Sequence, residues 1–118
     1  MIYLRQLNPT KDIGAKYQKW MNDMEVNKYT EQKYKKHSLK NIKHFVIQKN
    51  KSKNEFLYGI FLKKTKSHIG NIKLGPINFI HKFAEISYFI GEKKLWNKEY
   101  ATKAIKEIIK IARKKKLK

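Results

Sequence analysis

Residues with the clearest potential for chemistry lie in the last third of the 118-residue chain. An alternating run from Ala84 to Ile90 predicts a strand, and after a short loop a helix is expected to begin near Tyr100. The first amides of such a helix have no partner within it, so they attract phosphate. The residues alone therefore indicate a weak anion site, although most strand-loop-helix units bind no ligand.

Other kinds of site are disfavoured by the residue types present. The absence of cysteine excludes a disulfide framework, a cysteine-based zinc site and a cysteine nucleophile. The histidines lack metal-ligand spacing, and we expect them on the surface or in loops, with His81 a remote candidate for a base: His37, His44, His68 and His81. These residue types and spacings lead us to expect no metal site. No apolar run approaches the ~20 residues of a membrane span, so a cytoplasmic protein is expected.

The formal net charge of +20 is the composition of many nucleic-acid binders, which makes a basic nucleic-acid-binding domain the main alternative function. Only Arg5 and Arg113 among the 29 basic residues are arginine, the side chain best suited to bidentate base and phosphate contacts. Lysine is spread along the whole chain together with many asparagines and isoleucines. An AT-rich coding sequence would also produce this composition, so both explanations stay open.

The expected elements form one domain that begins with a strand from Ile2 to Leu7. Helical spacing follows from Asp12, with a break at Asn22-Asp23 and an extension toward Tyr29, and Ser38 is expected to cap a helix that ends near Asn50. Three strands and a long helix come next: 56–62, 68–77 with a bulge at Gly70 and a kink at Gly75-Pro76, 84–90, and the amphipathic helix from Tyr100.

The segment from Ile90 to Ile105 resembles the acyl-CoA-binding motif of GNAT acetyltransferases, especially the branch with the ribosomal-protein N-acetyltransferases. Members of that branch usually have Trp-Gly-Lys-Gly-Tyr-Ala-Thr-Glu-Ala, and this chain has a similar run from Trp96 to Ala104. Similar short stretches occur in the same order, at Trp20 to Val26, His37 to Leu39, His68 to Ile72 and Ala84 to Ile86. The resemblance therefore covers nearly the whole chain.

The resemblance implies an α/β (α+β) fold, with a mixed, mainly antiparallel sheet flanked by helices in the order β-α-α-β-β-β-α. Family members continue with a further strand, a helix and usually a hairpin, and the sequence ends before these parts. The next strand normally splays from the Ala84 to Ile90 strand and opens the cleft. A fragment, a degenerate gene and a subunit completed by a partner or by a second copy are the alternatives left open.

The resemblance also implies acetyl-CoA as co-substrate and no metal. Its pyrophosphate would bind loop amides before the last helix, and its pantetheine arm would pair with the preceding strand. A primary amine of an amino sugar, a protein N-terminus or a small metabolite would attack the thioester directly. The implied cofactor-binding residues are Tyr88, Phe89, Ile90, Leu95, Trp96, Asn97, Lys98, Glu99, Tyr100, Ala101 and Thr102.

Carried over in the same way, Glu85 beside the thioester is the candidate general base, although it could equally face solvent on an alternating strand. The implied substrate-facing wall contains a tryptophan and polar residues that could hold an amine, with core packing and helix capping as alternatives: Trp20, Asn22, Asp23 and Glu25. A catalytically inactive GNAT-like module is a further alternative.

Two residues depart from the motif, because Asn97 and Glu99 stand where the family normally has glycine. Asparagine tolerates left-handed backbone geometry, so Asn97 is a mild change. A carboxylate about 4 Å from a phosphate would cost about 1 kcal/mol in water and about 4 kcal/mol at an effective dielectric constant of 20. Glu99 is therefore expected to point outward, to pair with Lys98 or Lys103, or to weaken cofactor binding.

Overall fold

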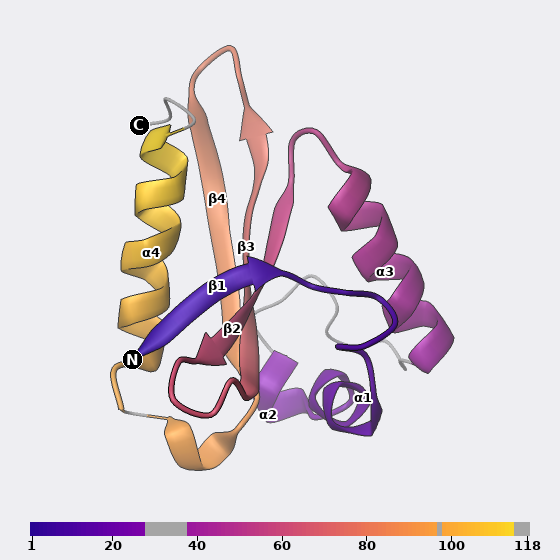
Figure 1. The fold of residues 1–118 in the computed structure, drawn as a ribbon. Coiled ribbons are helices and arrows are strands. Elements are labelled where there is room, and N and C mark those ends of the chain that lie inside the picture. Colours follow the sequence, from indigo (N-terminus) through magenta and orange to yellow (C-terminus); the bar gives the residue numbers. More distant parts are fainter. Residues whose placement is uncertain (28–37, 97, 115–118) are drawn as a thin grey trace.

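The computed structural model describes residues 1–27, 38–96 and 98–114, so Tyr29, His37 and Asn97 lie outside the described residues (Figure 1). The elements follow the expected order and confirm the predicted fold class. They are β1 (Ile2–Gln6), α1 (Ala15–Met21), α2 (Met24–Asn27), α3 (Leu39–Lys51), β2 (Phe56–Leu62), β3 (His68–Asn78), β4 (Phe83–Ile90), the 3-10 turn η1 (Lys93–Leu95) and α4 (Tyr100–Lys114).

The four described strands form one sheet in the order β1-β2-β3-β4, and all three pairings are antiparallel. The predicted bulge is next to Gly70, because Gly70 pairs with Ile60 while His68 pairs with Phe61. A second irregularity falls at Gly75-Pro76, the predicted kink. β4 lies at one edge of this sheet, which leaves one side of its backbone open within the described residues.

Helices cover both faces of the sheet, with α4 on one face and α1 and α3 on the other (Figure 1). The core is divided accordingly. The α1–α3 cluster contains Tyr17, Trp20, Ile42, Val46, Phe61 and Phe89 among its buried members, and the α4 cluster contains Ile60, Ile69, Ile72, Leu74, Ile90, Ala104 and Ile108. The sheet therefore has two hydrophobic faces, and each is closed by helices.

The ends of the helices follow their local sequence. Ser38 caps α3 as predicted, because its side chain accepts a hydrogen bond from the Asn41 amide. α4 begins at Tyr100, the predicted residue, and buries Ala104 and Ile108 from its apolar stripe. Among the helices of the described residues, none has the length and apolar content that a membrane span requires.

Candidate active site

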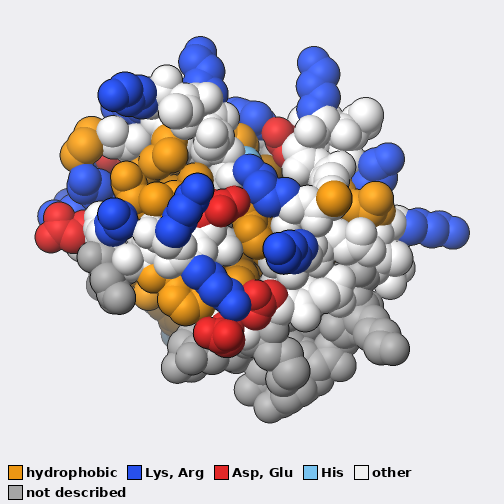
Figure 2. Space-filling view, turned by 90° about the horizontal axis from the view of Figure 1, so that it is seen from below, with side chains coloured by type: hydrophobic (Ala, Val, Ile, Leu, Met, Phe, Trp, Pro, Cys, Tyr) orange, Lys and Arg blue, Asp and Glu red, His pale blue; other side chains and the backbone are white. Residues whose placement is uncertain are grey.

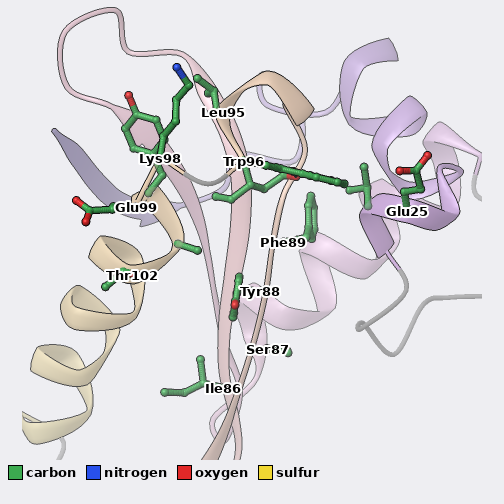
Figure 3. A pocket seen from close by; sticks show the side chains of 14 residues that line it. Glu25, Ile86, Ser87, Tyr88, Phe89, Leu95, Trp96, Lys98, Glu99 and Thr102 are labelled. Atoms are coloured by element: carbon green, nitrogen blue, oxygen red, sulfur yellow. The ribbon is translucent and has the colours of Figure 1, made fainter.

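A cleft of about 620 Å³ lies between β4, the loop that follows it, the start of α4 and α2. Its walls come from elements far apart in the sequence, and Figure 3 shows Glu25 at one end and Glu99 at the other, with Trp96 between them. The lining residues are Glu25, Val26, Ile86, Ser87, Tyr88, Phe89, Ile90, Leu95, Trp96, Lys98, Glu99, Tyr100, Ala101 and Thr102.

The strand wall of the cleft is the part of β4 that the sheet leaves uncovered. Ile86 and Tyr88 are 39% and 41% exposed, although both belong to the alternating apolar pattern of this strand. Phe89 and Ile90 are buried. Backbone amides and carbonyls at an open strand edge are free to pair with an extended ligand. An extended arm could therefore bind along β4 beside apolar side chains.

The opposite wall is the N-terminus of α4. The Lys103 amide donates to the Glu99 carbonyl over 3.0 Å, and this is the first hydrogen bond of the helix. The amides of Tyr100, Ala101 and Thr102 therefore precede the intrahelical pattern and have no partner within it. The first turn contains no acidic residue. This end of the cleft can bind an anion through backbone amides.

Glu99 has a backbone conformation that explains why the family has glycine at this position. Its φ angle is +66°, in the left-handed region, which costs a residue with a side chain roughly 1–2 kcal/mol. The side chain is exposed, and Figure 3 shows its carboxylate pointing away from Tyr88 and Trp96. Within the described residues no ion pair joins Glu99 to Lys98 or Lys103, so the outward orientation is the one observed.

Trp96 anchors the loop between the two walls. Its indole Nε1 donates to the Ile90 carbonyl over 2.7 Å, and its ring packs against both core clusters. It also lines the cleft, so one side chain both packs on the loop and forms part of the cleft wall. The loop is therefore fixed to the end of β4 by a side chain that forms part of the site.

Trp20 lies beneath the site instead of lining it. The indole is 5% exposed, and a Cβ atom at Gly91 would be 2.1 Å from its ring, so the ring packs directly against the Gly91 backbone. It also contacts Phe89 edge-to-face, with 6.0 Å between ring centroids. Core packing, one of the two sequence-based interpretations of Trp20, is the one observed, and the ring supports the floor of the cleft.

The three polar residues predicted on the substrate-facing wall differ in position. Asn22 closes α1, with its Nδ2 donating to the Gln18 carbonyl over 2.9 Å. Asp23 accepts from the Glu25 amide over 3.0 Å at the start of α2, and the hydrogen bond from Lys93 lowers the pKa of its carboxyl group. Of these three, Glu25 lines the cleft. Capping is therefore the observed role of Asn22 and Asp23.

Glu85 is exposed on β4, in register with the irregularity at Gly75-Pro76. It lines a separate hollow at the tip of the β3–β4 hairpin, together with Phe79, Ile80 and Phe83. The structure does not bring Glu85 into the cleft with the predicted cofactor-binding residues.

The expectation of surface or loop histidines is wrong for His68. This side chain is 8% exposed and stacks on Phe61, with 4.9 Å between ring centroids. Its Nε2 lies 2.7 Å from Asn71 Oδ1, and Asn71 Nδ2 donates to the Tyr17 hydroxyl over 2.6 Å. Burial lowers the pKa of His68. A polar network within the aromatic core satisfies this histidine, which the spacing in the sequence does not reveal.

His44 and His81, the other histidines within the described residues, belong to no metal-binding cluster. His44 and His81 are exposed, as expected, and His37 lies outside the described residues. In residues 1–27, 38–96 and 98–114 no group of three potential ligands among His, Cys, Asp and Glu is arranged to hold a metal ion.

Three residues that line the cleft were not identified from the sequence: Val26, Ile86 and Ser87. The signal for Ile86 was present, because it continues the apolar alternation through Tyr88 on a strand that proves to be at the sheet edge. Ser87 precedes the residues that the resemblance identified. Val26 lies on a four-residue helix, and only the packing of α2 beside β4 brings it to the site.

With the geometry established, the sequence identifies the family. The family model described as an acetyltransferase (GNAT) domain matches residues 2–118. The chain belongs to the GNAT acetyltransferase family. No curated protein matches the sequence of this GNAT domain.

Solved structures share the fold at low sequence identity. A GNAT-family acetyltransferase from Bacillus anthracis has a TM-score of 0.78 at 21% identity, over 98% of this chain and 65% of that one. The spermidine N-acetyltransferase from Vibrio cholerae, in complex with CoA and spermine, has a TM-score of 0.77 at 20% identity, over 94% and 63%. A putative ribosomal-protein-serine acetyltransferase from Vibrio cholerae has a TM-score of 0.70 at 14% identity, over 97% and 64%. The GNAT domain thus spans less than two thirds of the length of these three proteins.

Proposed function

We propose that the protein binds acetyl-CoA in the cleft between β4 and α4 and transfers the acetyl group to a primary amine. One observation carries the proposal. Every predicted cofactor-binding residue within the described part of the chain lines this one cleft, which lies between an edge strand of the described sheet and helix amides that have no partner within their helix. These are the two kinds of backbone surface that an extended arm and a pyrophosphate require.

The chemistry of the two walls fits the parts of the cofactor. The amides of Tyr100, Ala101 and Thr102 would donate to the pyrophosphate, and the outward direction of Glu99 keeps its carboxylate off those donors. The pantetheine arm would pair along the open edge of β4, beside Ile86 and Tyr88. Spermidine N-acetyltransferase, a solved structure of the same fold, was obtained with CoA and with an amine, spermine, which supports this choice of ligands.

Transfer would proceed by direct attack. The deprotonated amine nitrogen forms a bond to the thioester carbonyl carbon, the carbonyl oxygen is polarised by a backbone amide of β4, and the carbon-sulfur bond then breaks. The proton lost by the amine passes to a base or to water, and the departing thiolate takes up a proton. An amino sugar, a protein N-terminus and a small metabolite amine all provide such a nitrogen.

Glu85 remains the predicted base, and its position makes this role separately testable. Because its carboxylate does not line the cleft, Glu85→Gln would leave acetyl-CoA affinity unchanged. If Glu85 is the base, the variant loses turnover, most strongly at low pH where the amine is protonated. Unchanged turnover across the pH range would remove Glu85 from the mechanism and leave the proposed cofactor site intact.

Calorimetric titration with acetyl-CoA tests the proposed function. The protein should bind the cofactor, and Glu99→Gly should tighten binding by at most about fivefold, because it removes an outward-pointing negative charge and restores the family's glycine at a left-handed position. Glu107→Gln serves as the control, since Glu107 lies on the second half of α4 and pairs with Lys110 away from the cleft. No heat at millimolar acetyl-CoA would overturn the proposal.

A further inference from the structure

Lys93 does not line the cleft itself, but it pairs with Glu25, which does, at the end opposite α4. Its Nζ lies 2.8 Å from Asp23 Oδ2 and 3.2 Å from Glu25 Oε1. Lys93 begins η1, in the loop whose Leu95 and Trp96 line the cleft, whereas the two carboxylates belong to the α2 side. A single ammonium group therefore bridges the loop after β4 and the α2 side next to this end of the cleft.

The two sides of the bridge differ in how firmly they are held. The second oxygen of Asp23 accepts the Glu25 amide over 3.0 Å, so the carboxylate is positioned by backbone as well as by Lys93. The ammonium group of Lys93 ends a flexible four-carbon chain, and this side chain is 45% exposed. The hydrogen bond that Lys93 donates to Asp23 raises the pKa of Lys93, so its side chain stays an ammonium group at neutral pH.

We propose that Lys93 determines the acceptor specificity of this site, by occupying the position between Asp23 and Glu25 that a second ammonium group of an acceptor would otherwise take. The proposal rests on the proposed function, because it assigns the Glu25 end of the cleft to the acceptor amine. It names the preferred substrate class as amines with a single positive charge. Acceptors with several ammonium groups bind only by displacing Lys93.

A lysine side chain ends in a primary ammonium, so the geometry that binds Lys93 also fits the end of a diamine, and the two carboxylates cannot hold both at full strength. Lys93, Asp23 and Glu25 together carry one net negative charge, which matches an acceptor with one ammonium group.

The positive charge of the protein around this end of the cleft also disfavours acceptors with several ammonium groups. Figure 2 views the molecule from below, where Figure 1 places α1, α2 and the loop after β4, and shows lysine and arginine side chains spread over this face with carboxylates among them. The chain as a whole has a formal net charge of +20. Such a field disfavours the approach of polycations at low salt and fades beyond a Debye length of about 8 Å at physiological salt.

Binding of two matched probes tests the proposal without requiring turnover. The affinities of 1,4-diaminobutane and n-butylamine are measured by calorimetry on CoA-saturated wild type, Lys93→Met and the control Lys94→Met. Lys94 is the adjacent exposed lysine of the same loop. Lys93→Met should raise the preference for the diamine about threefold to tenfold, and Lys94→Met should leave it unchanged. Glu25→Gln added to Lys93→Met should cancel the gain.

The outcomes separate this inference from the proposed function. An unchanged diamine preference in Lys93→Met, or an equal gain in Lys94→Met, overturns the role of Lys93 while CoA binding still supports the cleft. A wild-type protein that binds neither CoA nor acetyl-CoA overturns the proposed function itself.

Discussion

β3 and β4 are adjacent strands that pair residue by residue, yet they differ sharply in burial. The first eight residues of β3, from His68 to Gly75, are all buried, whereas β4 buries Phe89 and Ile90 only. β3 is an inner strand of the sheet, and β4 lies at its edge. An alternating apolar pattern therefore predicts a strand but does not determine how much of that strand is covered. Two of the exposed apolar residues of β4, Ile86 and Tyr88, line the cleft.

Substitutions of Leu74 and Ile86 test the difference in burial between β3 and β4 most directly, because the two residues face each other across the paired strands. Leu74 is 1% exposed and Ile86 is 39% exposed. Leu74→Ala should lower the free energy of unfolding by about 3 kcal/mol, and Ile86→Ala by less than about 1 kcal/mol. Urea denaturation measures both. Equal losses would show that the edge strand is covered in solution.

Glu55 provides a second test of this difference, because it pairs with a lysine of the buried strand β3. Its carboxylate pairs with Lys49 at 2.7 Å and with Lys73, a buried lysine of β3, at 3.2 Å. Glu55→Gln should cost about 2 kcal/mol of unfolding free energy, because two cations of low exposure lose a charge partner. The exposed pair of Glu107 and Lys110 is the control, and Glu107→Gln should change stability by less than about 0.5 kcal/mol.

The carboxyl group of Glu55 should also make the stability of the protein depend on pH in the acid range. Burial alone would raise the pKa of Glu55, but the hydrogen bonds from Lys49 and Lys73 outweigh burial and lower it below 4.5. The stability that it contributes is therefore complete above pH 4.5 and is lost as the pH falls through the lowered value. A Glu55→Gln variant whose stability falls just as steeply with acid would assign that dependence to other groups.

The fold was largely predictable because its signals are local. Ser38, the Gly70 bulge and the start of α4 at Tyr100 all follow from capping or turn chemistry within a few residues. The burial of His68 was not predictable, because its partners Asn71 and Tyr17 are assembled by tertiary packing. The positions of Val26 in the cleft and of Lys93 beside it were not predictable for the same reason, since α2 meets the loop after β4 only in the folded chain.

Glu99 tests whether the cleft is under backbone strain that the inner strands lack. Replacing this left-handed residue with glycine should raise the free energy of unfolding by about 1 kcal/mol, independently of any effect on cofactor affinity. Glu99→Gln keeps the side chain and removes the charge, so it should leave stability nearly unchanged. If both variants stabilise equally, the charge of Glu99 is responsible instead of its backbone conformation.

His68, a buried residue of the core, should give the smallest effect, a weak dependence of stability on pH. Burial lowers its pKa from 6.5, so the unfolded chain takes up a proton more readily than the folded one. The stability linked to His68 is therefore complete above about pH 6.5 and is lost as the pH falls toward the lowered value. Urea midpoints between pH 7 and 5 should decline less in His68→Gln than in wild type; equal slopes would contradict this prediction.

The two tryptophans of the chain give the site its own optical reporters. Trp96 lines the cleft, and Trp20 lies under its floor, shielded by Gly91 and Phe89. Indole emission depends on the polarity around the ring, so a ligand that covers Trp96 should shift its fluorescence. Trp20→Phe would leave a single emitter in the cleft, and binding kinetics could then be followed by stopped-flow without a label or a coupled assay.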